Sequence, residues 1–215
     1  MKNRTIRVQG KGAVSQAPDR VQIHFTISET QEGFADAVEG CNTRIDAVRR
    51  AVSSAGLPAS ELKTTSFNIR EAHEYRSGTN IHVGFEAIHG TVIEIPLDKP
   101  LIGRLLTDVI RGKARPQVNL NFSVSDPEGL RQRVLADAVA NAKRRAETIA
   151  QAGSLKLGSI ENIEYGYSEI RISSEPCDLA LELASEPEPN VAPDFDPHDV
   201  DAVDTVTITW AINDA

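Results

Sequence analysis

The spacing of apolar residues switches repeatedly between two periods along this chain, and this switching constrains the fold more than any other feature. The alternating period is clearest at Val21, Ile23, Phe25 and Ile27, which predicts a half-buried strand. Residues 32–55 instead carry apolar side chains three or four positions apart, which predicts an amphipathic helix. Each kind of element must bury its apolar side against another, so the order of the periods indicates the fold class.

The predicted elements follow the order ββ-α-ββ-α-β-α-β-loop-β. Strands are predicted at 4–9, 21–28, 62–75, 81–95, 117–124, 155–172 and 204–212, and helices at 32–55, 101–110 and 126–151. Hairpins with three interspersed helices favour an α+β fold over a doubly wound parallel sheet. We expect one domain over residues 4–212, and an arrangement of two α/β subdomains stays open.

The last predicted helix carries many small residues on its apolar face. That face is predicted to contain Leu130, Val134, Leu135, Ala138, Ala142, Ile149 and Ala150. Small side chains allow close helix packing, either within one subunit or between subunits. In the first predicted helix, the apolar face is Phe34, Val38, Cys41, Ile45, Val48 and Val52, which makes Cys41 a core residue.

Negative charge is concentrated in one segment. The net charge is −8, yet residues 173–204 contain ten acids without a Lys or Arg, leaving 21 acids against 23 bases elsewhere. Five of the eleven prolines lie in the same segment. Proline and charge repulsion both oppose regular structure, so 173–199 is predicted to be an extended or mobile acidic loop before the last strand. Without a strong basic surplus, a nucleic-acid partner is not expected.

The acidic segment also suggests a divalent cation. Carboxylates alternate along Asp194, Asp196, Asp199 and Asp201, and oxygens at such spacing can converge on calcium. An EF-hand loop beginning at Asp194 would need glycine at its sixth position and glutamate at its twelfth, where Asp199 and Thr205 stand. A solvated acidic loop is therefore the favoured interpretation, and a cation- or ligand-binding module is the alternative. No other cofactor is expected.

One cluster of basic residues lies on the last predicted helix. It consists of Arg131, Arg133, Lys143, Arg144 and Arg145. The cluster lacks the aromatic side chains that stack on bases, so a solvated helix face is the default interpretation. The alternative is an interaction surface that receives the acidic segment of the same or a neighbouring subunit.

Motifs for catalysis are weak, and we predict no catalytic residues. Gly10-Lys11-Gly12 lacks the spacing of a phosphate-binding loop and precedes a strand, so its glycines indicate a bulge or a close strand crossing. The five histidines form no zinc motif, and they are expected on the surface or in strand packing. Cys177 lies in the acidic segment, where we expect it to be exposed.

Membrane and targeting signals are also weak. No apolar run approaches the ~20 residues needed to span a bilayer. The first residues lead directly into the first strand, without the apolar region of a signal peptide. The sequence as it stands therefore predicts a cytoplasmic protein, or a periplasmic one if a leader had been removed.

In motif order, the chain resembles the SIMPL family (domain of unknown function 541), bacterial proteins often labelled as oxidative-stress-defence or periplasmic immunogenic proteins. The matching features are Val8-x-Gly10-x-Gly12 with Pro18-Asp19, Ala35 and Asn42, Gly56, Thr64-Thr65-x-x-x-Ile69, Tyr75, Gly84-Phe85-x-Ala87, the alanines at 138, 142, 146 and 150, Gly153, Leu157-Gly158 and the last alternating strand.

The resemblance covers residues 4–212, and it implies an oligomeric, non-enzymatic protein that acts through protein–protein association, with a possible partner protein and a stress-related role. The family has no established catalytic residues, so none is carried over. The chain departs from the family at Asp199, where Asp-rich sequence replaces a Pro-Gly turn.

Overall fold

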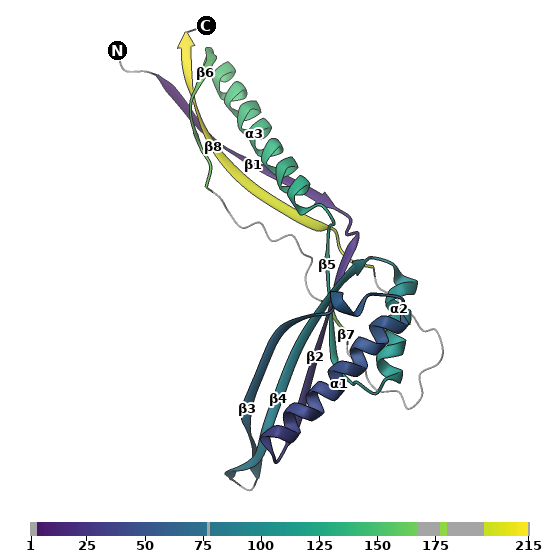
Figure 1. Ribbon diagram of the computed structural model, residues 1–215. Coiled ribbons are helices and arrows are strands. Elements are labelled where there is room, and N and C mark those ends of the chain that lie inside the picture. The colour runs from purple at the N-terminus through teal and green to yellow at the C-terminus, as the bar shows by residue number, and fades with distance from the viewer. Residues whose placement is uncertain (1–3, 77, 167–176, 180–195, 215) are drawn as a thin grey trace. The chain divides into compact units, whose positions relative to one another are not determined.

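The computed structural model describes residues 4–76, 78–166, 177–179 and 196–214, and the chain divides into two compact units (Figure 1). One unit contains β1 (Thr5–Gln16), α3 (Pro127–Ala152), β6 (Leu155–Glu164) and β8 (Val200–Asp214). We call it the α3 unit. Its strands are antiparallel and follow the order β1-β8-β6.

The second unit, called the α1 unit, has a larger sheet. It contains β2 (Arg20–Gln31), α1 (Phe34–Ser54), a 3-10 turn (Ala59–Glu61), β3 (Lys63–Arg76), β4 (Thr79–Pro96), α2 (Lys99–Arg111), β5 (Gln117–Ser123) and β7 (Cys177–Leu179). Its strands follow the order β3-β4-β2-β5-β7, and every pair is antiparallel. The predicted α+β fold and its element order are thus confirmed.

The core of the α1 unit lies between its helices and one face of the sheet. Val21, Ile23, Phe25 and Ile27 are fully buried there, as their alternation predicts. They pack with apolar residues of α1 and α2, including Ile45, Val52 and Leu105. Phe34 departs from the prediction: it is 53% exposed at the first turn of α1, where its ring meets the edge of Phe85.

The ends of the helices follow the predicted signals. The carboxylate of Asp98 accepts a hydrogen bond from the Leu101 N–H at the start of α2, and Asp126 does the same for Gly129 at the start of α3. Gly56, two residues after the end of α1, has a φ of 85°, a left-handed conformation that glycine adopts at low cost. These local contacts explain why the helix bounds could be predicted from sequence.

In the α3 unit, the predicted break at the first glycines is wrong. Strand β1 runs without interruption to Gln16, pairing with β8 from Thr5↔Ala211 to Gln16↔Val200. The glycines serve a close approach, but to a helix. A Cβ at Gly10 would lie 2.6 Å from the Ala142 nitrogen, well inside normal contact distance.

Helix α3 buries a narrow stripe of residues spaced four apart. The buried positions are Leu130, Val134, Ala138, Ala142, Ala146 and Ala150. Ala138, Ala142 and Ala146 pack with Val8, Val206, Ile208 and Trp210 of the sheet, whereas Leu130 and Val134 pack with Val124, Val200 and Ala202. Leu135 is half-buried and Ile149 is 52% exposed, so the prediction that placed Ile149 on the buried face is wrong. Helix α3 packs closely along strand β1, so only one narrow row of its side chains is buried between the helix and the sheet.

The last strand begins earlier than the predicted position 204, and a short strand, β7, lies within the predicted acidic loop. Strand β8 begins at Val200, because Val200 and Ala202 continue its buried alternation. The three residues of β7, within the predicted loop, pair with β5. Residues 167–176 and 180–195, and with them most of the predicted loop and the end of the predicted 155–172 strand, lie outside the described residues. Among the helices that are described, none is long and apolar enough to cross a membrane.

Candidate functional site

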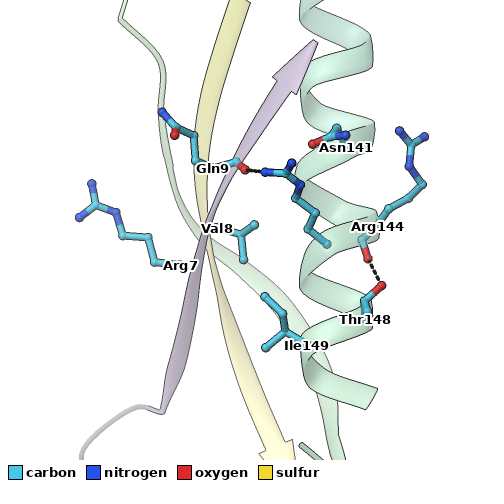
Figure 2. Close-up of a pocket in the computed structure, with 8 residues that line it drawn as sticks. Arg7, Val8, Gln9, Asn141, Arg144, Thr148 and Ile149 are labelled. Atoms are coloured by element: carbon cyan, nitrogen blue, oxygen red, sulfur yellow. Dashed lines mark hydrogen bonds between the residues drawn. The ribbon is translucent and has the colours of Figure 1, made fainter. Parts of the chain in front are cut away.

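The free edge of β1 is covered by polar side chains of α3. The Lys11 N–H donates to Asn141 Oδ1 (3.3 Å), and the Ala13 N–H donates to Asp137 Oδ2 (3.1 Å). The Gln9 carbonyl accepts a hydrogen bond from the Arg145 guanidinium (3.2 Å), as Figure 2 shows. We call these three contacts the edge ladder.

The edge ladder rests on a match between two repeats. Its helix positions are four residues apart, which advance α3 by about 6 Å. Its strand positions are two residues apart, which advance β1 by about 6.6 Å. The outward-facing backbone groups of β1 therefore meet successive side chains on one helix face. A sheet edge with satisfied backbone groups is a poor template for pairing with another chain.

An open groove of about 510 Å³ lies where the edge ladder ends. It is lined by Arg7, Val8, Gln9, Asn141, Arg144, Arg145, Thr148 and Ile149 (Figure 2). In this view Val8 and Ile149 point toward each other across the groove, whereas Arg7 and Arg144 extend away on opposite sides. The groove thus has an apolar floor and basic flanks.

The edge of the α1 unit at β3 is exposed. β3 is the end strand of its sheet, and of its described side chains only Ile69 and Ala72 are half-buried. Its pairing with β4 shifts register between Thr64 and Ser66 and again between Ala72 and His73. The stretch 66–72 between those irregularities is regular, and it carries Phe67 with 46% of its surface exposed.

Aromatic and imidazole rings form a row beside β3. The Phe67 ring contacts His89 edge-on, with centroids 5.2 Å apart. His73 and His82 face each other across β3 and β4 at 5.4 Å, and His82 also contacts Phe85. These edge-to-face pairs add stability to the outer strands. The predicted role of histidines in strand packing is thus confirmed for His82 and His89.

His89 makes a polar contact that the sequence did not reveal. Its Nε2 lies 3.0 Å from Thr64 Oγ1, and its Nδ1 is buried without a hydrogen-bond partner in the described structure. Burial, followed by the nearby charge of Arg49, lowers the pKa of His89. A hydroxyl–imidazole pair in catalysis needs a third group that orients the ring, and no residue in the described part of the chain hydrogen-bonds to Nδ1 of His89.

The side chains of the predicted basic cluster make separate local contacts. Arg131 pairs with Glu128 (3.4 Å), and Arg133 binds Gln16. Lys143 lies 3.9 Å from Glu147, and Arg144 lies 4.0 Å from Asp137. Arg145 belongs to the edge ladder. Of the predicted interaction residues, only Arg144 and Arg145 are brought together, at the groove.

The predicted acidic residues are only partly described. Asp196, Asp199 and Asp201 are exposed, and Asp199 accepts a hydrogen bond from Ser15 Oγ (3.3 Å). Asp194 lies outside the described residues. Within the described part of the chain, no three acidic, histidine or cysteine side chains are placed to share a metal ion. The cation site stays a prediction.

Asp204 differs from the other acids of its segment because it is buried. Only 4% of its surface is exposed, and it accepts hydrogen bonds from the Tyr165 hydroxyl (2.8 Å) and the Thr205 N–H (2.7 Å). A buried carboxylate needs such donors. The alternation of β8 could have indicated this inward position, since Asp204 stands between Ala202 and Val206.

Cys41 is a core residue, as predicted. Its side chain is fully buried, and burial is the main reason that the pKa of its thiol is raised. A raised pKa keeps the thiol protonated and unreactive. Cys177 is predicted to be exposed, but its side chain is outside the part of the structure that is described, so this stays a prediction.

Comparison with known proteins matches this architecture to one family. The family model SIMPL, described as a protein of unknown function (DUF541), matches residues 6–210. The 26 kDa periplasmic immunogenic protein of Brucella melitensis is 23% identical over 74% of this chain and 65% of its own length. The uncharacterized protein YggE of Edwardsiella ictaluri is 21% identical, over 77% of this chain and 70% of its own length.

A human protein is also similar. The interleukin-1 receptor-associated kinase 1-binding protein 1 of Homo sapiens is 26% identical over 72% of this chain and 57% of its own length. The chain thus spans less than two thirds of the length of the Brucella and human relatives. Because the family model matches almost the whole chain, the protein belongs to the SIMPL family.

Proposed function

We propose that this protein is a non-enzymatic association module that pairs with a second copy of itself through the exposed edge of β3. The observation that carries the proposal is the contrast between two sheet edges. α3 covers β1 with the edge ladder, whereas β3 presents the regular stretch 66–72 without such a cover in the described structure. An uncovered edge strand is a template for strand addition.

The side chains of β3 also suit a protein contact. Phe67 and the half-buried Ile69 lie in the regular stretch, so strand pairing would bury apolar surface as well as satisfy backbone groups. The exposed edge at β6 is less suitable, because its pairing with β8 shifts register twice between Leu157 and Asn162. Irregular backbone limits how many consecutive hydrogen bonds a partner strand can form.

The comparison supports a binding role in general terms. The name of the human relative states that it binds a kinase, and a binding function is what the proposal assigns to this chain. Two Brucella relatives are named periplasmic, and we propose the same compartment and a stress-related role here. Cell fractionation tests the compartment, and comparing peroxide survival of deletion and complemented strains tests the stress role.

Light scattering after size-exclusion chromatography tests self-association. We expect the protein to form dimers or larger assemblies, and Phe67→Lys to shift it toward monomer by placing a charge at the new interface. The matched control is Ile163→Lys, since Ile163 is 53% exposed on β6 of the other unit. Melting curves establish that both variants are folded. A monomer at all concentrations, or an equal effect of the control, would refute the proposal.

A further inference from the structure

The edge ladder stops before β1 does. Its strand positions are 13, 11 and 9, and its helix positions are 137, 141 and 145. The next rung would join Arg7 to position 149. Residues two apart in a strand direct their backbone groups to the same side, so the N–H and C=O of Arg7 face the open edge. Position 149 is isoleucine, which cannot hydrogen-bond to them.

The missing rung leaves three features side by side. Among the described residues, no strand pairs with the outer edge of β1 at Arg7, and Ile149 is half-exposed above the floor that Val8 forms (Figure 2). The residues that line the groove include three arginines and no acid. Arg7 is paired with Glu164. Arg144 is more weakly paired, because its guanidinium lies as far as 4.0 Å from the Asp137 carboxylate and its side chain is largely exposed.

We propose that this groove binds an extended acidic peptide that carries an apolar residue between its acids. The peptide backbone would add to the β1 edge at Arg7, as in other cases of strand addition. Its apolar side chain would cover Val8 and Ile149, and its carboxylates would lie near the arginines on the flanks. This binding is separate from pairing at β3, which lies in the other unit.

The chain contains a sequence of this composition. Residues 180–186 read Ala-Leu-Glu-Leu-Ala-Ser-Glu, and the whole stretch 173–204 lacks Lys and Arg. A synthetic peptide with this sequence is therefore the natural probe. Its matched control replaces both glutamates with lysine, which keeps the length and the leucines but reverses the charge.

Fluorescence anisotropy of the labelled peptide with the full chain tests the proposal. We expect saturable binding, weakened at least about tenfold by Ile149→Glu and by Arg144→Glu, which corresponds to about 1.4 kcal/mol. The control is Arg131→Glu, on the same helix but outside the groove. Hydrogen exchange supplies a second measurement, in which the Arg7 amide should exchange more slowly when the peptide is bound.

The outcomes are distinct. Tight binding of the lysine peptide, equal binding by Ile149→Glu, or an Arg7 amide whose exchange the acidic peptide leaves unchanged would each overturn the proposal. An acidic peptide that binds while the protein remains monomeric would support the groove and refute pairing at β3. Assembly of the protein without binding of the acidic peptide would support pairing at β3 and refute peptide binding in the groove.

Discussion

Gly12 lies directly against Ala138. A Cβ added at position 12 would be 2.6 Å from the Ala138 backbone nitrogen and 3.1 Å from the Ala138 side chain. A Cβ contact of 2.6 Å essentially never occurs in folded proteins, so the glycine sets how closely α3 approaches β1. The edge ladder depends on that approach, because its hydrogen bonds span from the helix to the strand edge.

Substituting Gly12 should therefore destabilise the α3 unit. We expect Gly12→Val to lower the free energy of unfolding by about 2 kcal/mol or more, since overpacking forces the helix away from the strand. Urea denaturation measures the loss. Gly166→Ala is the control, because a Cβ there would meet no atom within 4 Å. Equal stability of the two variants would contradict the close-packing argument.

Removing rungs of the edge ladder should weaken folding and expose an edge. Asn141→Ala deletes the acceptor of the Lys11 N–H, and we expect a loss of about 1 kcal/mol. The uncovered edge should also raise the rate of aggregation, followed by light scattering at 37 °C. Asn162→Ala serves as control, since the Asn162 side-chain amide donates to the exposed Glu164 side chain on the same strand, away from the edge ladder. An unchanged aggregation rate in Asn141→Ala would show that the rungs do not protect β1.

Stability should depend on the protonation of His89. Burial lowers its pKa in the folded state, so the unfolded state binds a proton more readily. The stabilisation is complete above about pH 6.5, the ordinary value, and is lost as pH falls below it. Between pH 7.5 and pH 4.5, the melting temperature should fall less steeply with decreasing pH for His89→Gln than for the wild type. Identical slopes for His89→Gln and the wild type would exclude His89 as the cause.

The alternative function, a divalent-cation site in the acidic segment, makes its own prediction. Calorimetric titration with calcium should release or absorb heat, and Asp196→Asn together with Asp199→Asn should weaken the binding, because hard cations need carboxylate oxygens. Magnesium at the same concentration tests ion selectivity. No heat and no shift in melting temperature up to millimolar calcium would remove this alternative.

Local signals in the sequence were sufficient for most elements. The caps at Asp98 and Asp126, the alternation of β2 and the glycine after α1 act within a few residues of themselves, so they can be read without the rest of the chain. The start of the last strand could not be predicted from such local signals. Its true start at Val200 depends on pairing with Gln16, a residue far away in the sequence.

The sequence by itself determined the α+β class, the order of the elements, the family and the burial of Cys41, because periodicity and caps are properties of neighbouring residues. Only the tertiary structure decided what Gly10 and Gly12 approach, why Ile149 is exposed, and which arginines of α3 are already paired. Each of these depends on the placement of α3 along β1. That placement joins residues more than a hundred positions apart, through contacts whose partners no local pattern specifies.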